Sequence, residues 1–143
     1  VNSFQEIGYG GQVVYCALGE IQTLLNFSPE TVLIYIGGND ADGQSWYGPE
    51  QAAIYYRRMI DILLEHNITP VIHLIHEASL TRDRDYVREF NGRLTQLALE
   101  RNLKVIPNMK ELSFLSHRKK LVIILTIGAK ARNALRIPMT ENI

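Results

Sequence analysis

The sequence predicts an α/β domain in which amphipathic helices cover a parallel β-sheet. Three short runs of β-branched and apolar residues alternate with segments whose apolar residues recur every three or four positions. The short runs lack polar alternation, which is typical of strands buried on both faces of a parallel sheet. Strands and helices that alternate in this way form right-handed βαβ units. The length of 143 residues fits one domain.

The first part of the chain contains one predicted helix and one predicted strand. Apolar residues at helical spacing predict a helix over residues 12–25, and Asn26 with the following Ser-Pro pair ends it. Cys16 falls inside this helix, and we interpret it as a small core residue rather than a nucleophile. The apolar run over residues 31–36 predicts a buried strand. Residues 5–7 form a short candidate for an earlier strand.

The alternation continues to about residue 106. Gly48-Pro49-Glu50 is typical of a helix start, because proline suits the first turn and an acidic residue suits the helix dipole. The next strand is predicted over residues 70–75, a third helix over residues 83–101, and a third strand over residues 103–106.

The last part of the chain departs from this pattern in order and in charge. Residues 121–127 are apolar enough for a buried strand or a hydrophobic helix, and residues 129–136 fit one helical piece closed by Pro138. Residues 1–109 carry eight basic and thirteen acidic residues, a net charge of −5, whereas residues 110–143 carry seven and two, a net charge of +5. We therefore expect a partial α/β domain over 1–109, followed by an atypical basic segment that is not a separate domain.

Composition excludes several classes of function. The fifteen basic and fifteen acidic residues balance, so no global field attracts nucleic acid or an anionic membrane. One cysteine excludes an internal disulfide framework and a cysteine-rich zinc site. No apolar run is long enough for a membrane span. We expect a soluble, cytoplasmic protein, and the sequence leaves open both a signal peptide upstream of Val1 and the oligomeric state.

The sequence predicts neither a metal site nor a cofactor. The Asp-Ala-Asp-Gly run that starts at Asp40 resembles part of a calcium loop, but Gly38 and Pro49 stand where the first and last ligands would be. His73 and His76 lie three positions apart on a predicted strand, so we expect them on opposite faces, where they cannot share a metal ion.

Two glycine-containing segments are candidates for chemistry. Gly37-Gly38-Asn39-Asp40 follows a predicted strand, at the edge of a parallel sheet where ligands bind. The side-chain amide of Asn39 offers donors suited to an oxyanion, although the same residues also suit a loop that bonds its own backbone. Gly8-Tyr9-Gly10-Gly11 precedes a helix, so its backbone amides suit an anion or form a flexible turn.

Together these segments resemble the SGNH (GDSL-type) family of serine ester hydrolases. The resemblance covers about three-quarters of the chain, ends near Pro107, and is most specific at Gly37-Gly38-Asn39-Asp40. It implies a three-layer, flavodoxin-like parallel sheet flanked by helices and a small ester or acylated molecule as substrate. It also implies an oxyanion hole formed by Asn39 and Gly11, or Gly10 if the turn shifts by one residue, with Gly38 and Asp40 in support.

The same resemblance shows what the chain lacks. The family nucleophile is a serine in a Gly-Asp-Ser motif on the first strand, and neither that motif nor that strand precedes Gly11. No aspartate follows Asp85, so the late Asp-x-x-His motif is absent, and His117 cannot complete it. The missing first strand predicts an open edge near the second strand. We expect a fragment or degenerate member of the family that keeps its oxyanion residues and is nearly inactive.

Two alternatives remain open at this point. One is a non-catalytic α/β module that binds a ligand or a partner through the retained pocket. The other is a truncated or misread gene whose parent is an ordinary esterase. An upstream in-frame Gly-Asp-Ser in the encoding DNA, or another frame that yields Asp-x-x-His, would decide for truncation.

Overall fold

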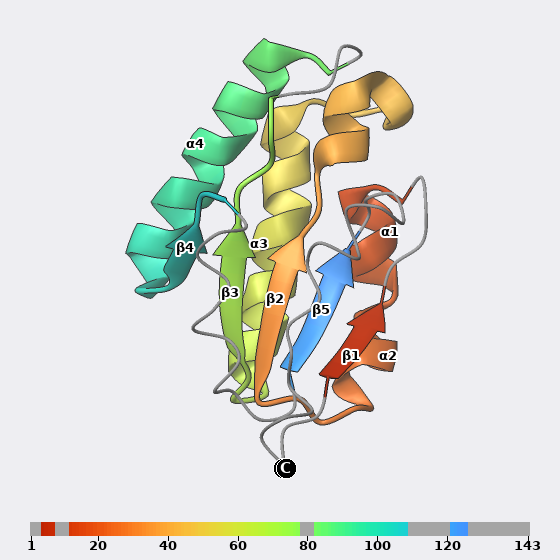
Figure 1. Ribbon diagram of the computed structural model, residues 1–143, viewed down its shortest axis with the longest axis vertical. Coiled ribbons are helices and arrows are strands. Elements are labelled where there is room, and N and C mark those ends of the chain that lie inside the picture. The colour runs from red at the N-terminus through yellow and green to blue at the C-terminus, as the bar shows by residue number, and fades with distance from the viewer. Residues whose placement is uncertain (1–3, 8–11, 78–81, 109–120, 126–143) are drawn as a thin grey trace.

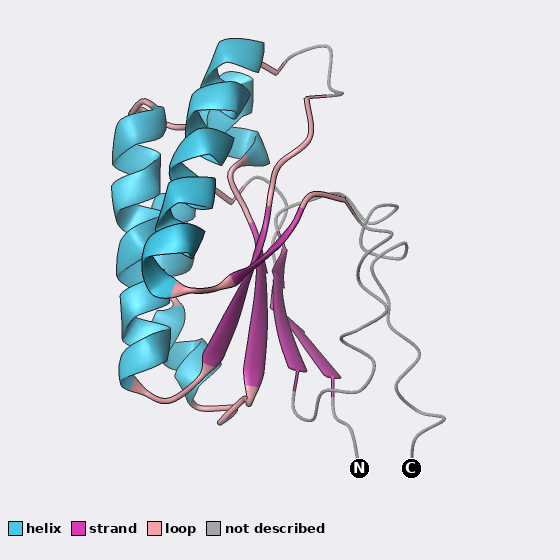
Figure 2. Ribbon diagram, turned by 90° about the vertical axis from the view of Figure 1, so that its left-hand side faces the viewer, coloured by secondary structure: helices cyan, strands magenta, loops and turns pink. Residues whose placement is uncertain are grey.

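The structure, a computed structural model, contains one parallel β-sheet with helices packed on one of its faces (Figures 1 and 2). It describes residues 4–7, 12–77, 82–108 and 121–125. The elements in chain order are β1 (Phe4–Ile7), α1 (Val14–Gly19), α2 (Ile21–Leu25), β2 (Thr31–Tyr35), the π-helical turn η1 (Asp40–Gln44), α3 (Pro49–Glu65), β3 (Thr69–His73), α4 (Arg84–Arg101), β4 (Lys104–Ile106) and β5 (Leu121–Leu125). The predicted α/β class with a parallel sheet flanked by helices is confirmed.

The order of the strands explains why the described helices share one face. The sheet runs β1-β5-β2-β3-β4, and every neighbouring pair is parallel. The chain connects β1 to β2, then β2 to β3, then β3 to β4, and each of these connections moves in the same direction across the sheet. Right-handed crossovers in one direction place their helices on one face, and Figure 2 shows α1 to α4 on the same side of the strands.

The most C-terminal described element, β5, lies inside the sheet. It pairs with β1 on one side, where Glu6 is opposite Ile123, and with β2 on the other, where Leu33 is opposite Ile123 (Figure 1). A flavodoxin-like sheet has its first strand at this position, in the order 2-1-3-4-5. The expected opening near the second strand is thus absent, because a strand from the C-terminal segment fills it. Of the two alternatives for this run, a strand is correct.

The N-terminal helix differs from its prediction. A break at Glu20 divides it into α1 and α2, and Gly19 beside the break lowers the local helix propensity. Cys16 is exposed on α1, so its interpretation as a core residue is wrong. Val14, Ala17 and Leu24 are the buried residues of these two helices.

The two long helices begin where the sequence predicts. Gly48 precedes α3, whose first residue is Pro49. Asp83 is the N-cap of α4, and its side chain accepts hydrogen bonds from the backbone N–H groups of Asp85 and Tyr86. Inside the layer, the Tyr56 hydroxyl donates to the carbonyl of Ile34, and the Tyr56 ring meets Phe90 edge to face. These contacts fix α3 and α4 against the carboxyl-terminal half of β2.

No helix in the described ranges is both long enough and apolar enough to cross a membrane. Residues 129–136, for which we predicted a helical piece, lie outside the described residues.

Candidate active site

The Gly37–Gln44 segment turns sharply at the carboxyl end of β2. Gly37 has a φ of 126°, a conformation that side chains other than glycine rarely adopt. The backbone N–H of Ala41 donates to the carbonyl of Gly37 at 3.1 Å and closes the turn. Gly38 and Asp40 are buried, and Asn39 is half-buried. The predicted motif therefore lies at the sheet edge where parallel α/β proteins bind ligands.

The side chain of Asn39 reaches the chain segment next to the second glycine motif. Its Nδ2 donates to the carbonyl of Gln12 at 2.8 Å. Gln12 directly follows Gly11, but Gly8–Gly11 lies outside the described residues. The participation of Gly10 or Gly11 in one site with Asn39 stays a prediction, and the bond to Gln12 supports it.

Asp40 ties the same turn to the start of α1. Both of its carboxylate oxygens lie 3.3 Å from the backbone nitrogen of Val14, and the Tyr47 hydroxyl donates to Oδ2 at 2.5 Å. The backbone N–H of Tyr15 in turn donates to the Tyr47 hydroxyl oxygen at 3.1 Å. Burial raises the pKa of Asp40, and the bonds from Tyr47 and Val14 act in the opposite direction. Asp40 thus holds residues 13–15 beside Asn39.

The neighbouring strand end is fixed by α4. The side-chain amide of Asn91 donates to the carbonyl of Ile75 and accepts from its backbone N–H, at 2.9 and 3.0 Å. The Asn91 side chain therefore satisfies both backbone polar groups of Ile75, which lies beyond the end of β3. Neither Asn91 nor Tyr47 was singled out from the sequence for such a contact, because their partners lie 16 and 7 residues away and no local pattern marks them.

Two histidines lie at the end of β3. His73 is fully buried, its ring stacks on Tyr35 with centroids 4.0 Å apart, and its Nδ1 lies 2.6 Å from the Leu74 carbonyl. Nε2 of His73 is buried and has no hydrogen-bond partner among the described residues. The prediction that His76 lies on the opposite face is wrong: β3 ends at His73, the ring centroids are 6.4 Å apart, and His76 is exposed.

The described residues include two serines, and neither is placed as a nucleophile beside a histidine. Ser28 precedes β2 at the amino-terminal edge, opposite Asn39. Ser45 lies beyond the turn, where its hydroxyl donates to the Tyr47 carbonyl at 3.2 Å. Ser3, Ser79 and His117 lie outside the described residues. The described arrangement offers an amide donor for an oxyanion and a rigid support for it.

Comparison with solved structures gives the fold a name. A GDSL-like lipase from Bacteroides thetaiotaomicron matches with a TM-score of 0.62 and 16% identity, over 87% of this chain and 67% of that one. The psychrotrophic esterase EstA from Pseudoalteromonas sp. matches at 0.59 and 18% identity, over 76% and 57%. The SGNH-hydrolase family esterase AlinE4 matches at 0.57 and 24% identity, over 76% and 56%. This chain has the SGNH-hydrolase fold.

Identities of this size establish the SGNH fold alone. This chain spans about half the length of two further solved structures that it matches, 50% of one and 53% of the other. No family model and no curated protein matches the sequence. The resemblance in fold that the motifs predicted is confirmed.

Proposed function

We propose that this chain is a member of the SGNH ester hydrolases that keeps the oxyanion half of the active site and lacks the nucleophile and the base. The observation that carries the proposal is the position of Asn39 at the carboxyl end of β2, with its amide bonded to Gln12. The shared fold and the Gly37–Asp40 motif support family membership. The ligand is then a small ester or another acylated molecule, as the names of the structural neighbours suggest.

The chemistry of such a half-site is electrostatic. When a nucleophile attacks an ester, negative charge develops on the carbonyl oxygen, and preformed N–H donors stabilise it. The Asn39 amide is one donor, and the Gly11 backbone N–H is the second in this proposal. Loss of one such donor from a complete enzyme typically raises the barrier by about 3–4 kcal/mol. A half-site alone binds and polarises an acyl group but supplies no attacking atom.

A non-catalytic binding module is the second candidate. The placement of Ser28 and Ser45 favours it: Ser28 lies at the opposite edge of the sheet from Asn39, and the Ser45 hydroxyl donates to the Tyr47 carbonyl rather than to a histidine. In this function the turn that carries Asn39 holds an acyl group without hydrolysing it.

Titration with an ethylphosphonate anion, a tetrahedral analogue of the charged intermediate, tests the proposal. We expect the side-chain amide signals of Asn39 in ¹H–¹⁵N spectra to shift with saturation, and Asn39→Ala to weaken binding. Sulfate at equal charge is the control for non-specific anion binding. Saturation that is unchanged in Asn39→Ala would contradict an oxyanion site at this residue.

A further inference from the structure

Arg82 directly precedes Asp83, the N-cap of α4, and makes a bidentate ion pair with the turn that carries Asn39. Its Nε donates to Oδ1 of Asp42 at 3.0 Å, and its Nη2 donates to Oδ2 at 3.2 Å. Its Nη1 donates to the carbonyl of His76 at 2.8 Å. The side chains of Arg82 and Asp42 are only 14% and 15% exposed. Arg82 thus connects the segments that follow β2 and β3.

The guanidinium also packs on the backbone directly before Asn39. A Cβ atom built on Gly38 would lie 2.7 Å from Nη2 and 3.1 Å from Cζ of Arg82. A side chain at position 38 would therefore displace the guanidinium from this position, so Gly38 allows the close approach of Arg82. The backbone N–H of Asp83 donates to the carbonyl of Ala41 at 2.9 Å. The successive residues Arg82 and Asp83 therefore both bond to the turn.

Asn39 and Asp40, in the same turn, bond to a different set of partners. Asn39 bonds to Gln12, and Asp40 bonds to Val14 and Tyr47. These bonds attach the turn to α1, whereas Arg82 and Asp83 attach it to α4. A turn held from both sides keeps its side chains within the narrow range of positions that oxyanion donors require.

We propose that Arg82 is a positioning residue for Asn39, acting through its ion pair with Asp42 and its contact with Gly38. The proposal deepens the proposed function and rests on it, because a fixed Asn39 amide matters only at an oxyanion site. The planar fork of arginine matches the carboxylate of Asp42, and it lies close to Gly38. A lysine ammonium at the same place cannot make the bidentate pair.

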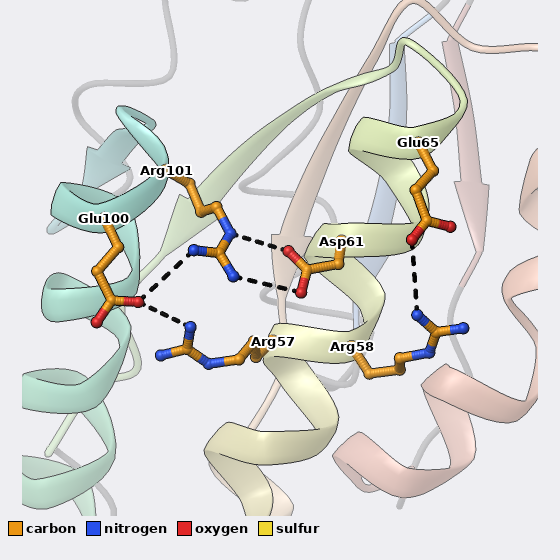
Figure 3. A network of polar contacts seen from close by, with 6 residues as sticks. All are labelled: Arg57, Arg58, Asp61, Glu65, Glu100 and Arg101. Carbon is orange, nitrogen blue, oxygen red and sulfur yellow. Dashed lines mark hydrogen bonds and ion pairs between the residues drawn. The ribbon is translucent and has the colours of Figure 1, made fainter.

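The chain contains a matched control pair elsewhere. Arg101 makes the same kind of bidentate contact with Asp61, at 2.9 and 3.4 Å, and joins α3 to α4 (Figure 3). Arg101 is the last residue of α4, at the opposite end of the helix from Arg82. The side chains of Arg101 and Asp61 are about one-third exposed, at 32% and 31%. Arg101→Gln therefore removes an Arg–Asp pair without touching the segments around Asn39.

The experiment compares Arg82→Gln, Arg82→Lys and Arg101→Gln by ¹H–¹⁵N spectroscopy and amide hydrogen exchange. In Arg82→Gln we expect the Asn39 side-chain amide signals to move and the Ala41 amide to exchange about tenfold faster or more, as loss of a charged hydrogen bond implies. Core amides of β2 should keep their exchange rates. Arg82→Lys should restore these features only in part, and Arg101→Gln should leave them unchanged.

Unchanged Asn39 signals and Ala41 exchange in folded Arg82→Gln would overturn the proposal, as would equal changes in Arg101→Gln. If Arg82→Gln does not fold, the same comparison is made with Arg82→Lys, where unchanged signals overturn it equally. These readouts need no ester. If the protein does not bind the phosphonate but Arg82→Gln alters the Asn39 signals, the proposed function alone is refuted. If the protein binds the phosphonate but Arg82→Gln leaves the Asn39 signals unchanged, the role of Arg82 alone is refuted.

Discussion

The Phe90 ring occupies the space that a side chain on Gly37 would need. A Cβ atom built on Gly37 would lie 2.5 Å from Cε2 of Phe90. The ring is fully buried and also packs on Tyr56. Helix α4 therefore sets how closely the strand end before Asn39 approaches the helical layer.

We predict that Gly37→Ala destabilises the protein by about 3 kcal/mol, because a strained positive φ and overpacking each cost about 1–3 kcal/mol. Gly43→Ala is the control, since Gly43 also has a positive φ, 85°, but open space around it. That variant should lose only about 1 kcal/mol. Urea unfolding measures both, and equal losses would show that contact with Phe90 contributes nothing.

The sequence predicted the elements whose side-chain pattern is local. The apolar run of β2 and the long stripes of α3 and α4 appear at nearly the expected residues, since burial on one or both faces determines their periodicity. Residues 121–127 fitted a strand or a helix equally well, because a short apolar run is ambiguous. Only pairing with β1 and β2 decides for a strand, and these partners are more than 80 residues away along the chain.

For the candidate site, the sequence likewise predicted the residues that a local pattern marks. Gly38, Asn39 and Asp40 were identified because they follow a strand, where parallel sheets place ligands. Their supporting contacts were missed. Arg82 and Asp42 are 40 residues apart, and the sequence suggested Asp42 only as part of a calcium loop. Such pairs depend on the packing of α4 against the turn, which no local spacing encodes.

Acid should destabilise the protein through His73. Burial, with a smaller contribution from the neighbouring His76, lowers the pKa of His73 to about 4 against the opposing effect of the hydrogen bond to the Leu74 carbonyl. The unfolded chain binds the proton near the ordinary pKa of about 6.5. Stability from this group is therefore complete above about pH 6.5 and falls by about 3 kcal/mol as the pH drops to about 4.

Urea unfolding at several pH values tests this expectation in wild type and His73→Phe, which keeps a ring beside Tyr35. The wild type should lose more stability than the variant between about pH 6.5 and 4. His66→Gln is the control, because His66 is exposed at the end of α3. Parallel pH profiles for wild type and His73→Phe would refute the prediction.

A proline in β5 should disrupt the whole sheet. Ile123 lies opposite Glu6 of β1 and Leu33 of β2, so the strand has hydrogen-bonded neighbours on both sides. We expect Ile123→Pro to cost about 3 kcal/mol or more, because proline removes a ladder bond in a central strand. Ile123→Val keeps a strand-forming residue and is the control.

The same variant tests our proposal that residues 110–143 are not a separate domain. Thermal unfolding followed by circular dichroism should show one transition, lowered strongly by Ile123→Pro. A transition that is unchanged by the proline would mean that the domain folds without β5.

The hydrolysis of p-nitrophenyl acetate, combined with a serine-directed phosphonate probe, tests most directly the claim that the chain keeps an oxyanion half-site without a nucleophile. We expect turnover of at most ~10³–10⁴-fold over water, the level that binding and an oxyanion hole sustain alone. This turnover should fall in Asn39→Ala and persist in Ser45→Ala, with no mass added by the probe. Stoichiometric labelling of one serine, with loss of turnover when that serine is replaced, would contradict the account.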